Sequence, residues 1–481
     1  MTAKFQQFKE YIKSLELDLS DLLLAIGFVF SVPFYAFAWK FMVTPNPAEI
    51  LFKNWMMIIC FACTAICWTE YFYLEIKKGR LKNNAFLWVY VFLTILGFIG
   101  VLVQPKTISN VIEVKHVNDI TKQYYGEVAL GDMVNVSYTI TPSHRLFFAF
   151  ATLIIPTIYY IILMVLPKRI KDLYFVVFCG ICVALFVLVI TCYSYIAEAH
   201  KYPLLLQAFF KGDMHAVYDK YSIESFLTHR VPYGVSIMLG IIFGLLLHSI
   251  TKKWYWFILV GYSYINLLLT WCKTAIALST LAIAFYLVLL LIESFKEHRK
   301  RNLILSIIYC SVVGLGLLVV LVSIITKGAV VAPAYKVFQS FTDGRTIKSR
   351  TFIWDNIRTL LSGGWIWIGR GFGTYNSMLF PMNILNGDLV CPSHSSYYAV
   401  LGQGGIFTLI GFLGSLIYFG FIFFKCFKVN KIMTLKLSIG VFTYFLYTFT
   451  EGINYIIVVF MFPTILYYWL IQRGLVSQES K

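Results

Sequence analysis

Charged residues are scarce in this sequence. Aspartate, glutamate, lysine and arginine make up 13% of its 481 residues, against about 25% in an ordinary soluble domain. Hydrophobic residues make up 59% and aromatic residues 18%. Because so few polar side chains cannot cover the surface of a folded chain in water, we expect a protein dissolved in lipid.

Several specific features are also missing. The ten cysteines lie mostly in apolar runs and form no disulfide framework. Residues 369–373 contain three glycines but do not follow a strand in a βαβ unit, so they are no nucleotide-binding loop. Residues 2–19 carry acidic side chains and no cleavage site, so we do not expect a cleaved signal. No acidic cluster suited to Mg²⁺ is evident, and we expect neither a metal nor a cofactor.

Long apolar runs recur along the whole chain and predict about twelve helices that cross a bilayer. The expected spans are 21–43, 55–75, 85–104, 146–166, 173–197, 232–250, 254–271, 275–292, 303–326, 397–424, 434–450 and 453–472. The predicted fold is thus an all-α polytopic membrane protein, with residues 1–481 forming a single membrane domain.

Positive charge is distributed unevenly between the predicted spans. The formal net charge is +17, and the cations crowd into short connections at 77–80, 168–171, 252–253, 299–301 and 425–436. All of these fall on one side if the spans alternate, and the positive-inside rule makes that side cytoplasmic. Topology therefore accounts for the charge and nucleic acid is not an expected partner. Both termini are predicted to be cytoplasmic.

The opposite side carries three long connections, at 105–145, 198–231 and 327–396. They mix acidic and basic residues with glycine, proline and asparagine turn signals. The third is the largest and is predicted to carry short helices. We expect the working face of the protein outside the cytoplasm, with the 327–396 loop as its catalytic part.

His394 stands at the end of that loop, where the next apolar helix begins. Ser393 or Ser396 would cap the helix, which places His394 in its first turn. Cationic neighbours would keep its imidazole neutral, as a general base requires. The alternative is a histidine that serves only as a satisfied polar residue.

Arginines precede His394 in the same loop, at positions 345, 350 and 370. Arg350, Trp354 and Arg358 share a face if 349–361 is helical, and Gly363-Gly364 would end that helix. Glycines at 369, 371 and 373 would let the backbone bend closely around a ligand or the membrane surface. Each arginine could instead be a solvated or lipid-phosphate contact.

Lys273 lies between two apolar spans with almost no loop. It would sit at the outer mouth of a helical hairpin. One interpretation is a snorkelling lysine that marks the interface. The other is a cation held near the interior of the bundle, favoured by the small residues around it.

Taken together, residues 349–354, 369–375, 394–398 and 404–407 resemble the signature of the bacterial O-antigen ligase and Wzy-type polysaccharide polymerase superfamily. The hairpin at 270–277 resembles an earlier motif of that family. The resemblance covers about residues 230–425 in motif. Two positions depart from the pattern, since the family commonly has arginine where this chain has Lys273 and asparagine where it has Ser395.

The resemblance implies a metal-independent glycosyl transfer on the outer face of the bacterial inner membrane. The donor would be a glycan on undecaprenyl pyrophosphate, and the acceptor a second lipid-linked repeat unit or lipid A–core. His394 would deprotonate the acceptor hydroxyl, and Arg350 with Lys273 would hold the pyrophosphate. Further candidates for phosphate or substrate contact are Arg230, Arg370, Arg345, Trp354 and Tyr397. Besides membrane lipids, the implied partners are a chain-length regulator and a flippase.

Three functions remain open from the sequence. A repeat-unit polymerase is favoured, because the loops at 105–145 and 198–231 look individual, as recognition of one particular repeat unit would require. A ligase of the same superfamily shares the chemistry. A lipid or polysaccharide transporter would place ionisable residues or broken helices at mid-membrane. It is less favoured, because here Glu70 lies inside a span and His248 near the inner end of one, while the polar cluster lies outside.

Overall fold

The computed structural model describes residues 55–79, 95–142, 173–214, 216–227, 229–296, 300–328, 345–371, 374–385 and 394–450, apart from position 97, together with a few single residues elsewhere. The predicted spans 21–43, 146–166 and 453–472, most of 85–104 and both termini lie outside these ranges.

The described chain is mostly helical, and its long helices coincide with the spans expected there. They are α4 (Trp55–Lys77), α8 (Leu173–Ala197), α10 (Arg230–Thr251), α11 (Trp256–Thr270), α12 (Lys273–Lys296), α13 (Lys300–Ile325), α18 (Ser396–Val429) and α19 (Lys431–Thr448). Of these, α10, α12 and α18 are long and apolar enough to cross a membrane. Helix α8 joins them if it is counted with α9 (Lys201–Lys211), to which it is bent by 86°.

Helix α10 is the centre of the bundle. Its side chains are buried without interruption from Pro232 to Ser249, and α8, α11, α12 and α19 pack around it. Close packing is possible because small residues lie at the contacts, for example Gly240 against Ser263. The surrounding helices instead expose apolar side chains, such as Leu185 of α8 and Leu281 of α12, as surfaces that face lipid do.

A second layer lies beside the bundle and contains the only strands of the described residues. Strands β1 (Thr107–Glu113) and β2 (Met133–Thr139) form an antiparallel hairpin around α6 (Asp119–Tyr125). The prediction of an all-α protein was wrong in this respect. The reason is that β1 alternates exposed and buried residues over only seven positions, a strand pattern too short to stand out beside long apolar helices.

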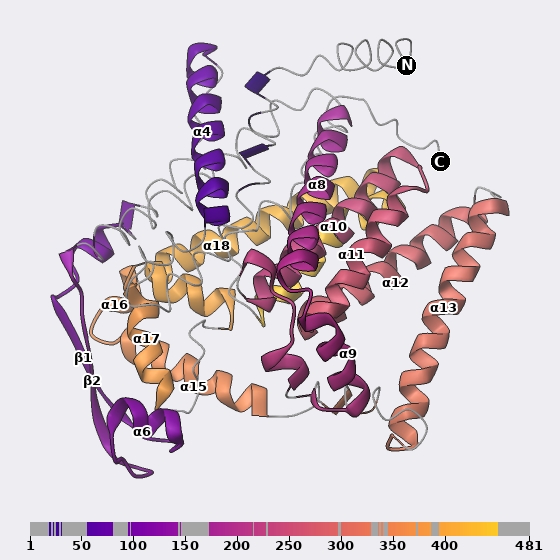
Figure 1. Cartoon of the computed structure of the whole chain (residues 1–481). Helices are drawn as coiled ribbons and strands as arrows, with labels where there is room; N and C mark the ends of the chain where they lie inside the picture. The colour runs from indigo at the N-terminus through magenta and orange to yellow at the C-terminus, as the bar shows by residue number, and fades with distance from the viewer. Residues whose placement is uncertain are drawn as a thin grey trace.

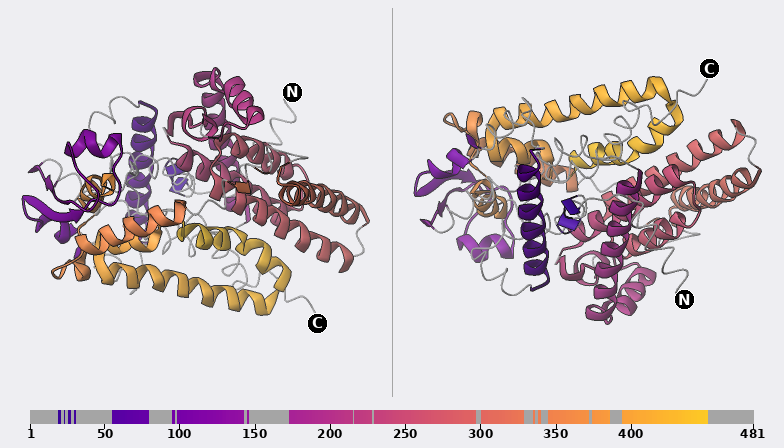
Figure 2. Two further views of the ribbon diagram at one scale, coloured as in Figure 1. Left: turned by 90° about the horizontal axis from the view of Figure 1, so that it is seen from below. Right: turned by 90° about the horizontal axis from the view of Figure 1, so that it is seen from above.

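The hairpin packs against helices from the third predicted loop, α15 (Arg345–Leu360) and α17 (Thr374–Ile384) (Figure 1). Ile112 and Val136 share one core with Ile357 and Met382. The hydroxyl of Tyr125 donates to the carbonyl of Pro381 at 2.7 Å, so the contact is polar as well. The segments 105–142 and 345–385 therefore build one layer, where the sequence suggested separate loops. Two further views place this layer and the α12–α13 hairpin at opposite sides of the molecule (Figure 2).

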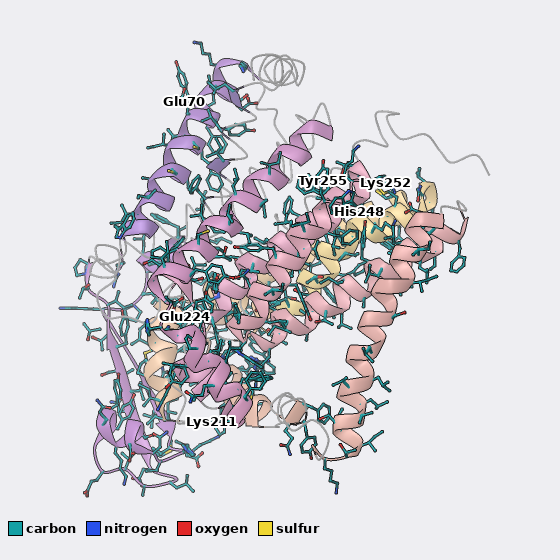
Figure 3. The ribbon with its side chains drawn as sticks, turned by 45° about the vertical axis from the view of Figure 1, so that its right-hand side comes forward. Glu70, Lys211, Glu224, His248, Lys252 and Tyr255 are labelled. Atoms are coloured by element: carbon teal, nitrogen blue, oxygen red, sulfur yellow. The ribbon has the colours of Figure 1, made fainter. Side chains whose placement is uncertain are left out.

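The two ends of the bundle differ in their residues. We call the "His394 end" the one where α10, α12 and α18 begin, and the "Lys252 end" the one where α10 and α12 finish. Figure 3 places Lys211 and Glu224 near the first, and Lys252 and Tyr255 near the second.

The connection at 198–231 is folded at the His394 end. It contains α9, a π-helical turn η1 (Ala216–Lys220) and a 3-10 turn η2 (Ser225–Leu227). The buried carboxylate of Glu198 holds it together, accepting bonds from the backbone nitrogens of Glu224 at 3.1 Å and Ser225 at 2.7 Å and from Lys201 Nζ at 2.7 Å.

Candidate functional site

His394 lies just before helix α18 and is half-buried. The helix begins at Ser396, and Ser395 is its cap residue, with an extended backbone and a carbonyl that accepts from Ala399 N at 2.9 Å. His394 itself is in the left-handed region, at φ 47°. The expectation that it forms part of the first helical turn was therefore wrong. A residue with a Cβ adopts this conformation at a cost, which is a feature of functional sites.

Tyr398 joins α18 to α15. Its ring is stacked on that of Trp354, with centroids 4.9 Å apart and planes 8° apart, and its hydroxyl accepts a hydrogen bond from Arg358 Nη2 at 3.0 Å. Trp354 and Arg358 thus share a face of α15, as predicted. Arg350 lies one turn earlier on this helix and is half-buried. Arg345 is the first residue of α15, and its side chain lies outside the described part.

The neighbouring Tyr397 contacts α19 instead. Its ring lies 5.1 Å from that of Phe449 and 5.6 Å from that of Phe412. Its hydroxyl accepts from Thr448 Oγ1 at 3.4 Å. The adjacent tyrosines after His394 therefore tie the start of α18 to two elements, α15 on one side and the end of α19 on the other.

Lys273 is the first residue of α12, after a turn of minimal length. Trp271 makes the turn in a left-handed conformation, at φ 51°, and Thr270 Oγ1 accepts from Cys272 N at 3.0 Å. Cys272 Sγ lies 3.4 Å from the hydroxyl of Tyr447, one residue before the Thr448 that contacts Tyr397. The predicted hairpin with almost no loop is confirmed.

Arg230 is the first residue of α10, with His229 as cap through a bond from Val231 N to Nδ1 at 3.2 Å. One turn later, Gly234 packs against Cys272 so tightly that an added Cβ would lie 2.8 Å from it. A continuous series of contacts therefore runs from the start of α10 through the α11–α12 turn and the end of α19 to the start of α18. It gathers Arg230, Lys273 and His394 at one end of the bundle.

Arg370 has an architectural role. It is 7% exposed, donates from Nε to the carbonyl of Leu360 at 2.7 Å and from Nη1 to Gln104 Oε1 at 3.0 Å, and lies over the ring of Trp365 at 4.0 Å. Burial lowers the pKa of its guanidinium to about 10. Gln104 returns a bond to the Arg370 carbonyl. No local pattern could have predicted this partner, because Gln104 lies 266 positions from Arg370.

Helix α18 is broken at Gly405, where it contacts the glycines on either side of Arg370. Gly405 interrupts the helix at φ 68° and ψ −164°. The carbonyls of Gly402 and Gln403 accept instead from the backbone nitrogens of Arg370 and Gly371, both at 2.8 Å. A Cβ on Gly369 would meet the Gln403 backbone at 2.5 Å. The 369–371 segment thus bends around α18, where the sequence suggested a ligand or the membrane surface. Gly373 lies outside the described residues.

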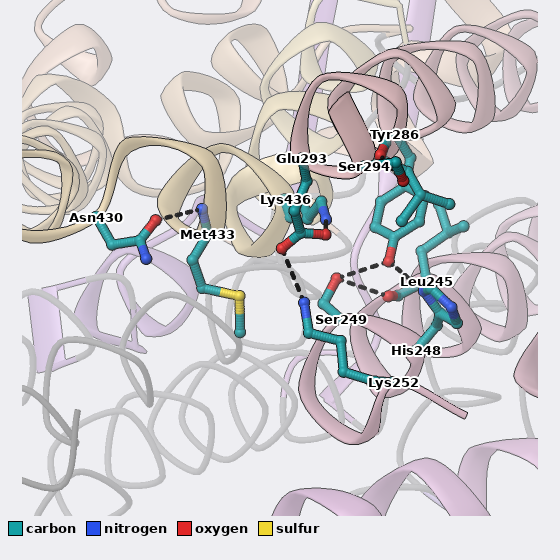
Figure 4. A network of polar contacts seen from close by, with 11 residues as sticks. Leu245, His248, Ser249, Lys252, Tyr286, Glu293, Ser294, Asn430, Met433 and Lys436 are labelled. Atoms are coloured by element: carbon teal, nitrogen blue, oxygen red, sulfur yellow. Dashed lines mark hydrogen bonds and ion pairs between the residues drawn. The ribbon is translucent and has the colours of Figure 1, made fainter. Parts of the chain in front are cut away.

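A second polar cluster lies at the Lys252 end, between α10, α12 and α19 (Figure 4). The carboxylate of Glu293 binds Lys252 at 2.9 Å and also Lys436, whose side chain is fully buried. Beside it, Tyr286 bonds His248 Nδ1 at 2.6 Å and accepts from Ser249 Oγ at 3.0 Å. His248 was noted from the sequence as an ionisable residue near a span end. Its polar contacts join helices to one another.

Replacing Lys436 with methionine is expected to destabilise the protein by about 1.5–3 kcal/mol, because the partly buried carboxylate of Glu293 loses one of its two charged hydrogen bonds. The change is measured as a fall in the apparent Tm in detergent. In the matched variant, Glu293→Gln is added to Lys436→Met and removes the charge left behind, so it should recover much of the loss. Equal Tm values for the single variant and the unchanged protein would contradict a stabilising role for the cluster.

No protein-family model, curated protein or solved structure matches this chain.

Proposed function

We propose that the protein is a glycosyltransferase that polymerises lipid-linked oligosaccharide repeat units. In this proposal the chain crosses the bacterial inner membrane about twelve times with both termini in the cytoplasm. The His394 end faces outward and the lysine-rich Lys252 end faces the cytoplasm.

The contacts of Tyr397 and Tyr398 are the observation that carries the proposal. They tie the start of α18, two residues after His394, to the helix that carries Arg350 and to the end of α19, which contacts the turn before Lys273. In the proposal, the His394 imidazole works together with the cations Arg350, Lys273 and Arg230 at this end of an apolar bundle. This is the combination that activation of a hydroxyl and departure of a pyrophosphate require.

The reaction is a single displacement at the anomeric carbon of the donor glycan. His394 takes the proton of the acceptor hydroxyl while the oxygen of that hydroxyl attacks the anomeric carbon and forms the new glycosidic bond. The bond from the anomeric carbon to the pyrophosphate breaks, and the electron pair leaves with the polyprenyl pyrophosphate. Arg350 and Lys273 neutralise its charge, with Arg230 as a further contact. Inversion of configuration follows from one displacement.

The break in α18 argues against the transporter alternative. Transporters use unwound backbone in the membrane to bind substrate or ions. Here the carbonyls at the break are bonded to the chain's own 369–371 segment. A ligase that transfers glycan to lipid A–core would use the same chemistry and differs only in its acceptor.

The test is reconstitution of the purified protein in vesicles with a polyprenyl-pyrophosphate oligosaccharide. A ladder of products spaced by one repeat unit supports the polymerase. Transfer of the glycan only to added lipid A–core would indicate a ligase instead of a polymerase. Movement of the lipid between leaflets without formation of glycosidic bonds would indicate a transporter.

In the same assay, Arg350→Lys is expected to lower the rate about 10–100-fold, whereas Lys273→Arg is tolerated. A guanidinium binds two pyrophosphate oxygens at once, and loss of such a charged hydrogen bond costs about 1.5–3 kcal/mol. The measurement is the ladder at matched membrane abundance. Thr359→Ser, which keeps the local hydroxyl bond to the Asp355 carbonyl on the same helix, is the control for general disturbance of α15. A normal ladder from Arg350→Lys would mean that positive charge alone suffices.

A further inference from the structure

Helix α9 is apolar on two sides. Leu205 and Ala208 face the bundle and are buried. Leu206 and Phe210, four residues apart and hence on a common face, are 50% and 74% exposed. A helix in contact with water on its outer side would carry polar residues there. The outer face of α9 therefore suits a hydrocarbon environment.

The orientation of α9 suits the surface of a membrane. Its axis is bent by 86° from that of α8, after a break of a few residues. If α8 lies along the membrane normal, α9 lies close to the membrane plane. Glu198 holds the bend, because its carboxylate accepts hydrogen bonds from Lys201 of α9 and from the backbone nitrogen of Ser225. The angle between α8 and α9 is therefore stabilised by hydrogen bonds.

Exposed apolar side chains lie on both sides of this corner. Helix α8 exposes Leu188 and Val189 and, in its last turn, Ile196, which is 82% exposed. These residues would face lipid in a spanning helix, and Leu206 and Phe210 extend the apolar surface after the bend. Lys211 ends α9 and is exposed, and a lysine in this place can reach lipid phosphates.

The inner side of α9 approaches the candidate site. Phe209 lies 5.2 Å from Trp271, ring centre to ring centre, in the turn that precedes Lys273. The backbone nitrogen of Ile223, in the same connection, donates to the carbonyl of Leu269 at 3.5 Å. Helix α9 therefore lies against the turn that leads to Lys273.

We propose that α9 is an interfacial helix, with Leu206 and Phe210 inserted among the lipid chains of the outer leaflet beside the site. The inference rests on the membrane location in the proposed function and is independent of glycosyl transfer, so the two fail in different experiments.

The test uses a photoreactive residue, p-benzoylphenylalanine, in place of Phe210 of the full chain. The protein is placed in vesicles of phosphatidylethanolamine and phosphatidylglycerol, and crosslinked peptides are identified by mass spectrometry. The control carries the same residue in place of Tyr124, an exposed aromatic on α6 in the second layer. We expect the lipid adduct at 210 to exceed that at 124 on the order of tenfold, since only a buried interfacial residue meets acyl chains.

Two results would overturn the inference. One is a lipid yield at 210 no higher than at 124, which would place Phe210 in water. The other is a crosslink from 210 mainly to peptide, from the same chain or from a second copy, which would mean that protein covers this face. Neither result requires an active preparation.

Discussion

Replacement of His394 by alanine is expected to lower the rate of polymer synthesis by about 10²–10⁴-fold, the usual effect of losing a general base. The residue lies outside α18, and the contacts of Tyr397 and Tyr398 hold the helix start without it. Membrane abundance and apparent Tm should therefore change little. The measurement is the initial rate of ladder formation at saturating donor.

Two further variants separate chemistry from backbone conformation. His394→Asn retains a residue type that tolerates the left-handed backbone but supplies no base, and it should be as inactive as the alanine variant. His116→Ala removes an exposed imidazole from the second layer, whose backbone contact to Leu385 stays, and should leave the rate unchanged. Substantial activity in His394→Asn would show that the position serves the fold alone.

Gly405→Ala should strongly destabilise the fold. At φ 68° and ψ −164° the backbone lies in a region used essentially by glycine alone. The added Cβ would also lie 2.3 Å from the Trp367 backbone, which cannot move aside as a side chain could. Strain and overpacking together give a loss of about 2–6 kcal/mol.

The apparent Tm and the yield of folded protein in detergent measure this loss. Gly414→Ala, on the same helix but with open space around it, is the matched control and should be neutral or slightly stabilising because alanine favours a helix. Equal behaviour of the two variants would mean that α18 is not broken at Gly405.

The long helices could be predicted because a bilayer-length apolar run is visible within the run itself. The end of α15 at Gly363-Gly364 and the tight turn before Lys273 could also be predicted, because their signals lie in neighbouring residues. The hairpin β1–β2 and the break in α18 depend on packing between segments far apart in the sequence. Gly405 lies within an apolar run that predicts one unbroken span. The break depends on contacts with the 367–371 segment, among them the close approach of Gly405 to the Trp367 backbone.

The candidate site divides in the same way. A local motif singled out His394 and Arg350, and the stacking of Trp354 with Tyr398 agrees with the predicted face of α15. Arg370 has the same residue type and lies in the same loop, yet its bonds to Leu360 and Gln104 turn it toward the protein. A sequence pattern identifies cations without revealing which of them already have partners.

The second layer also constrains how the protein is made. Its hairpin is synthesised long before its helices, since Tyr125 bonds a residue 256 positions later. At about 5–20 residues per second, the hairpin waits roughly 10–50 s for α15 and α17 to be translated. During that interval its apolar face lacks α15 and α17 as partners, and we expect the hairpin to depend on a chaperone or on the membrane-insertion machinery to keep it from aggregating. Truncated chains ending before residue 345 should accordingly be degraded or bound by such factors.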